Sequence, residues 1–185
     1  MIYLNDRLDE LDLDAALELL SDQRREQALK FRHEQGRRAC AAVYLLLCEA
    51  LREEYGIAER PVFEYGEHGK PFIAGRSDIH FNMSHCREAA VCVVADRPVG
   101  IDVESIGRYR DSLARYTMSE AELALITAAD RREVEFTRLW TMKEAKLKLS
   151  GEGLRTDMKT VLNGTEPFKT VVNLERGYVY SVISS

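Results

Sequence analysis

The sequence has few cysteines, and none is in a metal-binding arrangement. Four cysteines occur among 185 residues, at positions 40, 48, 86 and 92, and no two of them form a C-x-x-C pair. This spacing argues against a zinc site, and the small number argues against a disulfide framework. We therefore expect buried free thiols in a reducing compartment.

Long apolar runs are also missing. The run from Ala41 to Cys48, with the two apolar residues before it, is far shorter than the roughly 20 residues that a membrane-spanning helix needs. The N-terminal sequence MIYLNDRLDELD is acidic and lacks the apolar stretch of a signal peptide. We expect a soluble, cytoplasmic protein with no membrane partner.

An excess of positive charge is absent as well. Lys and Arg number 26 against 31 Asp and Glu, which gives a formal net charge of −5. Nucleic-acid-binding domains are usually basic, so we expect no nucleic-acid partner. With 45% hydrophobic and 31% charged residues, the chain is typical of a globular protein of one domain or two tightly joined halves.

What the sequence does contain is an alternation of helical and extended patterns. Helical periodicity covers about 14–31 and 35–55, and the second of these segments stops at Gly56. Short segments rich in β-formers follow, separated by Gly, Pro and Asp, and predict strands at 62–65, 79–82, 89–95 and 99–104.

The second half repeats this order. Ser119 and Glu122 form a capping box, and a long helix is predicted over 132–150, ending at Gly151. Strands are predicted at 158–162, 168–174 and 178–183, the first followed by an Asn163-Gly164 turn. A long helix followed by about three strands thus occurs twice, which suggests two similar α+β lobes.

The segment V-G-I-D-V-E, residues 99–104, places two carboxylates two residues apart. Asp102 and Glu104 face the same side of a strand, whereas Ile101 and Val103 face the core. Two adjacent carboxylates repel unless positive charge lies between them, and oxygen ligands of this kind suit Mg²⁺. The simpler interpretation is a solvated acidic strand end.

The segment F-T-R-L-W-T-M-K-E-A-K-L-K, residues 136–148, is apolar and densely charged. Glu144 and Lys148 lie one helical turn apart in the favourable order. They are either an ordinary surface ion pair or a third metal-binding carboxylate beside a phosphate-binding lysine.

Two further segments carry polar groups next to turns. Ser84 and His85, at the end of F-N-M-S-H, can bind a phosphate or simply satisfy turn backbone groups. In G-E-H-G-K-P, Lys70 presents a point charge beside Pro71, although the spacing is not that of a Walker A loop. The simpler interpretation of that segment is a β-turn.

Together the motifs are more specific than each one alone. In this order G-K-P, F-N-x-S-H, G-I-D-x-E and W-x-x-K-E-A-x-x-K resemble the signature set of the Sfp-type 4′-phosphopantetheinyl transferases, in their Trp/KEA branch. The resemblance spans Gly69 to Lys148, with a looser fit back to about Ser21.

The resemblance implies an α+β fold that is a pseudo-dimer of two similar lobes, here 1–98 and 99–185, with the active site in the cleft between them. It implies transfer of the 4′-phosphopantetheine group of coenzyme A to a serine of an apo acyl, peptidyl or polyketide carrier protein. Adenosine 3′,5′-bisphosphate is the product released, and the protein is expected to be a monomer.

The resemblance also implies roles for individual residues. Asp102, Glu104 and Glu144 are the expected Mg²⁺ ligands, with Glu144 also the general base for the carrier serine. Lys148 is expected to hold the pyrophosphate. The expected coenzyme contacts, in addition to Lys148, are Arg24, Arg38, Lys70, Pro71, Ser84, His85 and Lys143.

Two other functions are compatible with parts of the pattern. Asp102 followed by Glu144-Ala145-Lys146 matches the D…E-x-K pattern of a metal-dependent nuclease, but the acidic chain lacks a basic stripe. A coenzyme- or carrier-binding module without catalysis is the other alternative, although every metal and base position of the family set is filled.

Overall fold

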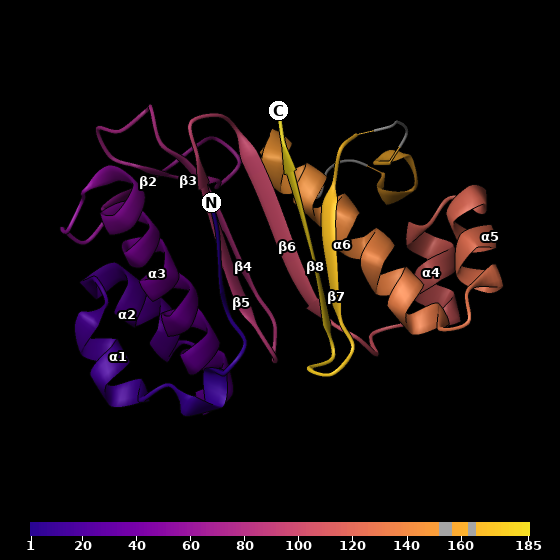
Figure 1. Ribbon diagram of the computed structural model, residues 1–185, viewed down its shortest axis with the longest axis horizontal. Helices are drawn as coiled ribbons and strands as arrows, with labels where there is room; N and C mark the ends of the chain where they lie inside the picture. The colour runs from indigo at the N-terminus through magenta and orange to yellow at the C-terminus, as the bar shows by residue number, and fades with distance from the viewer. Residues whose placement is uncertain (152–156, 163–165) are drawn as a thin grey trace.

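Two three-stranded antiparallel sheets stand side by side at the centre of the molecule, with helices on either side of the pair (Figure 1). The computed structural model describes residues 1–151, 157–162 and 166–185. All strands of one sheet come from residues 2–95, and all strands of the other come from residues 99–184.

The first sheet has the strand order β1-β5-β4. Its strands are β1 (Ile2–Asn5), β4 (His80–His85) and β5 (Ala90–Ala95). The long helix α3 (Glu34–Tyr55) packs on β5, and the short elements η1 (Leu8–Glu10), α1 (Leu13–Leu19) and α2 (Asp22–Leu29) pack on α3. A separate hairpin is formed by β2 (Phe63–Tyr65) and β3 (Pro71–Ile73).

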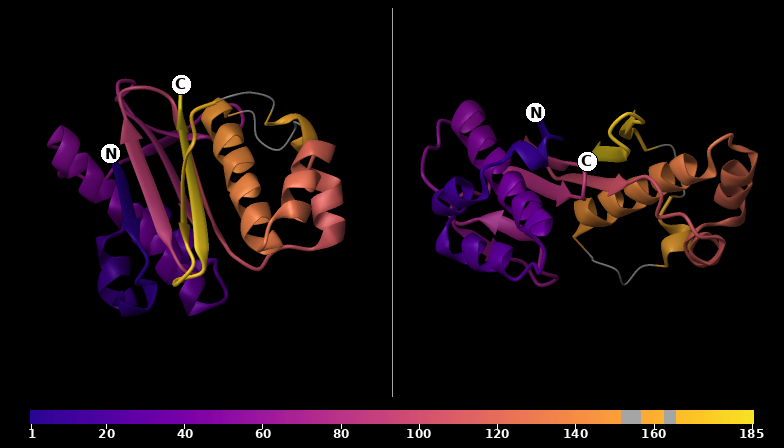
Figure 2. Two further views of the ribbon diagram at one scale, coloured as in Figure 1. Left: turned by 45° about the vertical axis from the view of Figure 1, so that its right-hand side comes forward. Right: turned by 90° about the horizontal axis from the view of Figure 1, so that it is seen from below.

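The second sheet has the strand order β6-β8-β7. Its strands are β6 (Val99–Ser105), β7 (Lys169–Asn173) and β8 (Tyr178–Ser184). The long helix α6 (Arg132–Ser150) packs on β6 and β8. The remaining elements lie beyond α6 and are α4 (Asp111–Thr117), α5 (Glu120–Ala128) and η3 (Met158–Thr160) (Figure 2).

Strand β5 is apolar throughout because both of its faces are buried. Cys92 and Val94 belong to the core beneath α3, whereas Val91 and Val93 belong to a second core shared with β6 and β8. Alternate residues of a strand point to opposite faces, so an uninterrupted apolar run is what a strand between two cores requires.

The predicted ends of the two long helices are confirmed. Gly56 follows α3 with φ 67° and Gly151 follows α6 with φ 74°, both in the left-handed conformation that glycine adopts most readily. The capping box at Ser119 and Glu122 is also present at the start of α5.

Two predictions of local structure were wrong, and three short elements were not predicted. The single helix expected over 14–31 is divided into α1 and α2, because Leu20 is extended and Ser21 caps a new helix by accepting from the Arg24 N–H. The strand expected at 158–162 is the 3₁₀ turn η3, capped by Asp157. Strands β1 and β3 and helix α4 were missed because each is too short for its periodicity to be read.

The Asn163-Gly164 turn lies outside the described residues. Among the described helices, none combines the length and the apolar character that crossing a membrane requires.

Candidate active site

The close packing of α6 against β6 depends on Gly100. A Cβ atom at this position would lie 2.0 Å from the carbonyl oxygen of Ala145 and 2.7 Å from the backbone nitrogen of Leu149. Both distances are far below any real contact and both involve backbone, so neither neighbour can yield. Glycine therefore lets α6 approach β6 directly, which places the Glu144 and Lys148 turn of the helix beside the carboxylates of the strand.

Three polar side chains from three elements meet at this contact. The Lys148 ammonium on α6 lies 2.6 Å from Asp102 Oδ1 on β6. Ser84 Oγ on β4 donates to the same oxygen at 2.8 Å and lies 2.9 Å from the Lys148 ammonium. The structure thus brings Ser84, Asp102 and Lys148 into direct contact, although they are far apart in the chain.

Asp102 is only partly satisfied by these partners. The residue is 4% exposed, and its second oxygen, Oδ2, is buried with no hydrogen-bond partner in the described structure. A buried carboxylate oxygen without a donor is costly. It is therefore a position where an additional positive ligand would be stabilising.

Glu104 and Glu144 share this excess of negative charge. Burial raises the pKa of Glu144, and the nearby Asp102 carboxylate raises it further. The pKa of Glu104 is raised by the same two causes in the same order. Both shifts mean that the protein environment does not fully neutralise the three carboxylates.

Arg108 is the second cation at this acidic cluster, and sequence reasoning missed it. Its guanidinium lies 2.6 Å from Glu104 Oε1 and 5.0 Å from the centre of the Trp140 ring, a cation–π contact. Its position four residues after Glu104 was the available signal, but the motif stopped at the second carboxylate.

The chemistry of this cluster fits a hard divalent cation. Asp102, Glu104 and Glu144 offer only oxygen ligands, one buried oxygen is unpartnered, and two of the carboxylates hold raised pKa values. Within residues 1–151, 157–162 and 166–185, however, no three His, Cys, Asp or Glu side chains already converge as a formed metal site. The described side chains are instead neutralised in part by Lys148 and Arg108.

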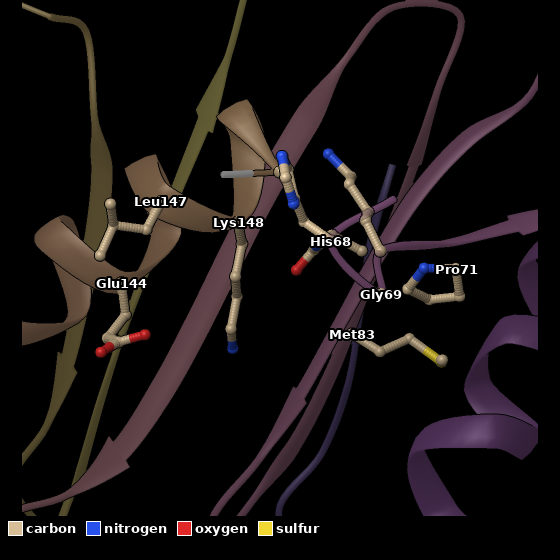
Figure 3. Close-up of a pocket in the computed structure, with 10 residues that line it drawn as sticks. His68, Gly69, Pro71, Met83, Glu144, Leu147 and Lys148 are labelled. Carbon is tan, nitrogen blue, oxygen red and sulfur yellow. The ribbon is translucent and has the colours of Figure 1, made fainter. Parts of the chain in front are cut away.

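Two cavities meet at Glu144 and Lys148. One, of about 250 Å³, is lined by Lys70, Pro71 and Met83 and by the last turns of α6. Figure 3 shows Glu144 and Lys148 extending in the same direction from α6, with Pro71 and Met83 across the space from them. The other, of about 910 Å³, is lined by Ser84, His85, Asp102, Glu104, Arg108 and Trp140, among others.

His85 lies at the edge of the larger cavity, in a positively charged surrounding. Burial, and then the charges of Arg24 and Lys148, lower its pKa to about 4, and its ring packs edge-on against Phe31 at 5.8 Å. Ser84 lines the same cavity and bonds to Asp102 on β6, whereas His85 contacts Phe31, which follows α2. A neutral imidazole flanked by two cations is suited to an anionic group.

Arg24 and Arg38 differ in their availability. Arg24 is buried and donates to Gln27 Oε1 at 2.9 Å and to the Cys40 carbonyl at 3.3 Å, while its Nε has no partner in the described structure. Arg38 is paired with Glu34 at 2.7 Å and lines neither of the two cavities.

Lys70 and Lys143 also have internal partners. The Lys70 ammonium donates to the Leu149 carbonyl at 2.9 Å, and burial lowers its pKa. Lys143 is 0% exposed, lies 2.8 Å from Glu122 Oε1 and donates to the Met158 carbonyl at 2.5 Å. This placement is at odds with the expected contact of Lys143 with a phosphate, because its ammonium points into α5 and η3.

Comparison with known proteins matches the sequence of this chain to one family. The family model described as the 4′-phosphopantetheinyl transferase superfamily matches residues 98–182. A 4′-phosphopantetheinyl transferase of Bacillus subtilis is 30% identical over 156 residues, which are 83% of this chain and 70% of that protein. The chain belongs to the 4′-phosphopantetheinyl transferase family.

Other members of the family show the same relationship. The 4′-phosphopantetheinyl transferase HetI of Nostoc sp. is 34% identical over 167 residues, 84% of this chain and 70% of HetI. The 4′-phosphopantetheinyl transferase Sfp of Bacillus subtilis is 28% identical over 156 residues, 83% of this chain and 70% of Sfp. The expected Sfp-type membership and transferase class are thereby confirmed.

Proposed function

We propose that this phosphopantetheinyl transferase moves the phosphopantetheine arm of coenzyme A onto a serine of an apo carrier protein, using the cluster of Asp102, Glu104, Glu144 and Lys148. The observation that carries the proposal is that Glu144 and Lys148 line both cavities, while Asp102 and Glu104 line the larger one beside them. A bent, two-ended substrate can lie with its ends in the two cavities and its pyrophosphate against these side chains.

The reaction requires a proton to leave the acceptor serine. Its oxygen attacks the phosphorus that bears the pantetheine arm, the bond from that phosphorus to the bridging oxygen breaks, and adenosine 3′,5′-bisphosphate leaves. Glu144 takes the serine proton, directly or through a water molecule. Its position supports this role, because Glu144 lines both cavities beside Lys148 and is therefore accessible to substrates in either one.

Charge neutralisation is the other requirement of phosphoryl-type transfer. We infer that Asp102, Glu104 and Glu144 hold Mg²⁺, which supplies positive charge to the pyrophosphate when it is bound. The Lys148 ammonium donates to Asp102 and Ser84. We propose that it also contacts the pyrophosphate and stabilises negative charge on the leaving oxygen.

The remaining contacts divide between the ends of the coenzyme. We propose that Ser84 and His85, supported by Arg24, bind the 3′-phosphate, and that Lys70 and Pro71 border the nucleotide. A contact of Arg38 remains a prediction, since its guanidinium would have to leave Glu34. For Lys143 we propose a positioning role, because its buried ion pair with Glu122 holds α5 against α6.

The arrangement of the chain supports two lobes, which we propose as 1–98 and 99–185. Each contains a long helix packed on a three-stranded sheet, α3 in the first and α6 in the second. The coenzyme site lies between them, as a pseudo-dimer fold implies. A monomeric, cytoplasmic protein without nucleic-acid partners remains the corresponding expectation.

Intact-mass spectrometry of an apo acyl carrier protein, incubated with this protein, coenzyme A and Mg²⁺, tests the proposal. We expect the carrier to gain one phosphopantetheine group and to lose that gain when EDTA is present. Peptidyl carriers in the same assay define the acceptor range. Coenzyme A binding without transfer to any carrier would indicate a binding module, and Mg²⁺-dependent DNA cleavage would indicate a nuclease.

A further inference from the structure

The two sheets meet along β4 and β6 without sharing backbone hydrogen bonds. The two strands pack against each other but belong to different sheets. The usual ladder that fixes neighbouring strands is therefore missing from the joint on which the proposed site is built. Side chains must set the relative position of β4 and β6.

Two of these side-chain links lie near the middle of the joint. Asn82 Oδ1 accepts from the Ile101 N–H at 3.3 Å, and Ser84 Oγ donates to Asp102 Oδ1 at 2.8 Å. Ser84 and Asp102 belong to the proposed site itself, so their link is open to rearrangement when substrate binds. A link outside the site is needed to hold the strands during that change.

Glu88 provides such a link at the end of the joint. It lies in the turn between β4 and β5, which is closed by the Cys86 N–H donating to the Ala89 carbonyl at 2.8 Å. Its Oε2 accepts a hydrogen bond from Ser105 Oγ, at the end of β6, and lies 3.6 Å from Cys86 Sγ. The Glu88 side chain is 23% exposed and lines neither of the two cavities.

The hydrogen-bond partners of Glu88 are adjacent in sequence to two residues of the proposed site. Cys86 directly follows His85, and Ser105 directly follows Glu104. One carboxylate oxygen therefore connects the neighbour of a proposed phosphate-binding residue to the neighbour of a proposed metal ligand. Hydrogen bonds to an ionised carboxylate are among the stronger ones in proteins.

We propose that Glu88 is a positioning residue, which fixes the spacing between His85 on β4 and Glu104 on β6 through its bond to Ser105. The inference rests on the proposed function, because both positioned residues are assigned by it. Small displacements of binding groups reduce catalysis strongly, so loss of this bond would weaken the hold on a coenzyme that contacts both strands.

Steady-state kinetics of Glu88→Ala, Glu88→Gln and Ser105→Ala test the role. We expect Glu88→Ala and Ser105→Ala to raise KM for coenzyme A about tenfold with a smaller change in kcat, and 3′-dephospho-coenzyme A to be affected less. Glu88→Gln, whose amide oxygen still accepts from Ser105, should stay within about threefold of the parent. Glu175→Ala, an exposed glutamate in the β7–β8 turn, is the matched control and should match the parent.

A double-mutant cycle in denaturant unfolding tests the link without any need for catalysis. If Glu88 and Ser105 stabilise the fold only through their mutual hydrogen bond, the free energy of unfolding of the double alanine variant will be no lower than that of the less stable single variant. Parent-like KM values in Glu88→Ala, or fully additive losses of stability, would overturn the proposal. If neither the parent nor Glu175→Ala transfers phosphopantetheine, the proposed function is overturned. The double-mutant cycle would still show whether Glu88 and Ser105 interact, because it measures unfolding and not transfer.

Discussion

At the scale of single residues, the site is defined by an imbalance between carboxylates and cations. Three carboxylates are gathered near two cations, Lys148 and Arg108. The cluster therefore carries a net negative charge. The buried Asp102 Oδ2, which has no hydrogen-bond partner in the described structure, is where this charge is least compensated. In the proposed reaction, this imbalance would favour the binding of a cation together with a pyrophosphate.

Replacing Lys148 by alanine is expected to slow transfer strongly, in addition to any loss of stability from leaving buried Asp102 without its cation. In the proposed reaction the ammonium is a preorganised cation at the leaving group, and such groups contribute about 2–4 kcal/mol to transition-state stabilisation. Single-turnover rates on an apo carrier protein measure the loss. Lys169→Ala, an exposed lysine on β7, serves as the control, and an unchanged rate in Lys148→Ala would reduce that residue to an ion-pair partner of Asp102.

The lowered pKa of His85 leads us to expect a specific pH dependence of the free energy of unfolding. Its pKa is about 4 in the folded chain because of burial and two neighbouring cations, against about 6.5 when unfolded. The unfolded chain therefore binds the proton more tightly, so stability contributed by neutral His85 is present above pH 6.5 and is lost as the pH falls toward 4. We expect a loss on the order of 2 kcal/mol over this interval.

Urea unfolding of the parent and of His85→Asn at pH 7 and pH 4.5 measures this effect. The asparagine variant does not titrate, so its stability should fall less across the same interval. Equal losses in the two proteins would show that other groups, not His85, cause the pH dependence.

At the scale of elements, the contact of α6 with β6 determines whether a site exists. The short distance between α6 and β6 is possible because Gly100 has no side chain. The Glu122–Lys143 ion pair then fixes α5, and through the Met158 carbonyl also η3, to the same helix. The active-site helix is therefore held from both sides.

Gly100→Ala is expected to destabilise the protein and to impair transfer. The added methyl group meets backbone atoms of α6 at 2.0 and 2.7 Å, and relieving such overpacking costs about 3 kcal/mol or more. Because α6 must shift away from β6, Glu144 and Lys148 move with it. Denaturant unfolding together with transfer assays measures both effects.

Gly66→Ala is the matched control for that variant. A Cβ atom there meets only the Lys70 carbonyl, at 3.7 Å, an ordinary contact. Its stability should remain within about 1 kcal/mol of the parent. If Gly100→Ala unfolds at the same denaturant concentration as Gly66→Ala, the packing of α6 on β6 does not require glycine at position 100.

Lys143→Met distinguishes a positioning role from phosphate binding. Removing one member of a buried ion pair leaves the other uncompensated and typically costs about 3–5 kcal/mol, so a large loss of stability is expected. At a temperature where the variant remains folded, KM for coenzyme A should change little. A stable variant with a strongly raised KM would restore the phosphate contact.

At the scale of the whole molecule, the site is made by two halves of the chain that each have their own sheet and helix. Ser84 and His85 come from the first sheet, and Asp102 and Glu104 come from the second. The apolar cluster that includes Val91, Val93, Ile101 and Val103 joins the sheets. A ligand in the cavities therefore contacts both halves at once.

Coenzyme A is expected to stabilise the molecule as one unit. At a ligand concentration of 100 times Kd, binding to the folded state alone adds about 2.7 kcal/mol. Thermal unfolding with Mg²⁺ and coenzyme A should show a single transition that moves upward. Two transitions, of which only one responds, would contradict a site shared between the halves.

Much of the local structure was predictable because its signals are local. The glycine caps at Gly56 and Gly151 and the Ser119 capping box act within one or two turns of helix. The same holds for the alternation that turns Asp102 away from the core. The break at Ser21 was the exception, because the apolar periodicity continues across a residue that starts a new helix.

The sequence by itself determined the family and the two long helices and supplied the candidate residues for the chemistry, since motifs and caps depend on residues close together in the chain. Only the tertiary structure decided which of those residues face one another. Lys143 and Lys148 lie on the same helix, yet one is buried against Glu122 and the other reaches Asp102. The reason is geometric, because the neighbours of a helix face depend on how α6 is packed, and no local pattern records that packing.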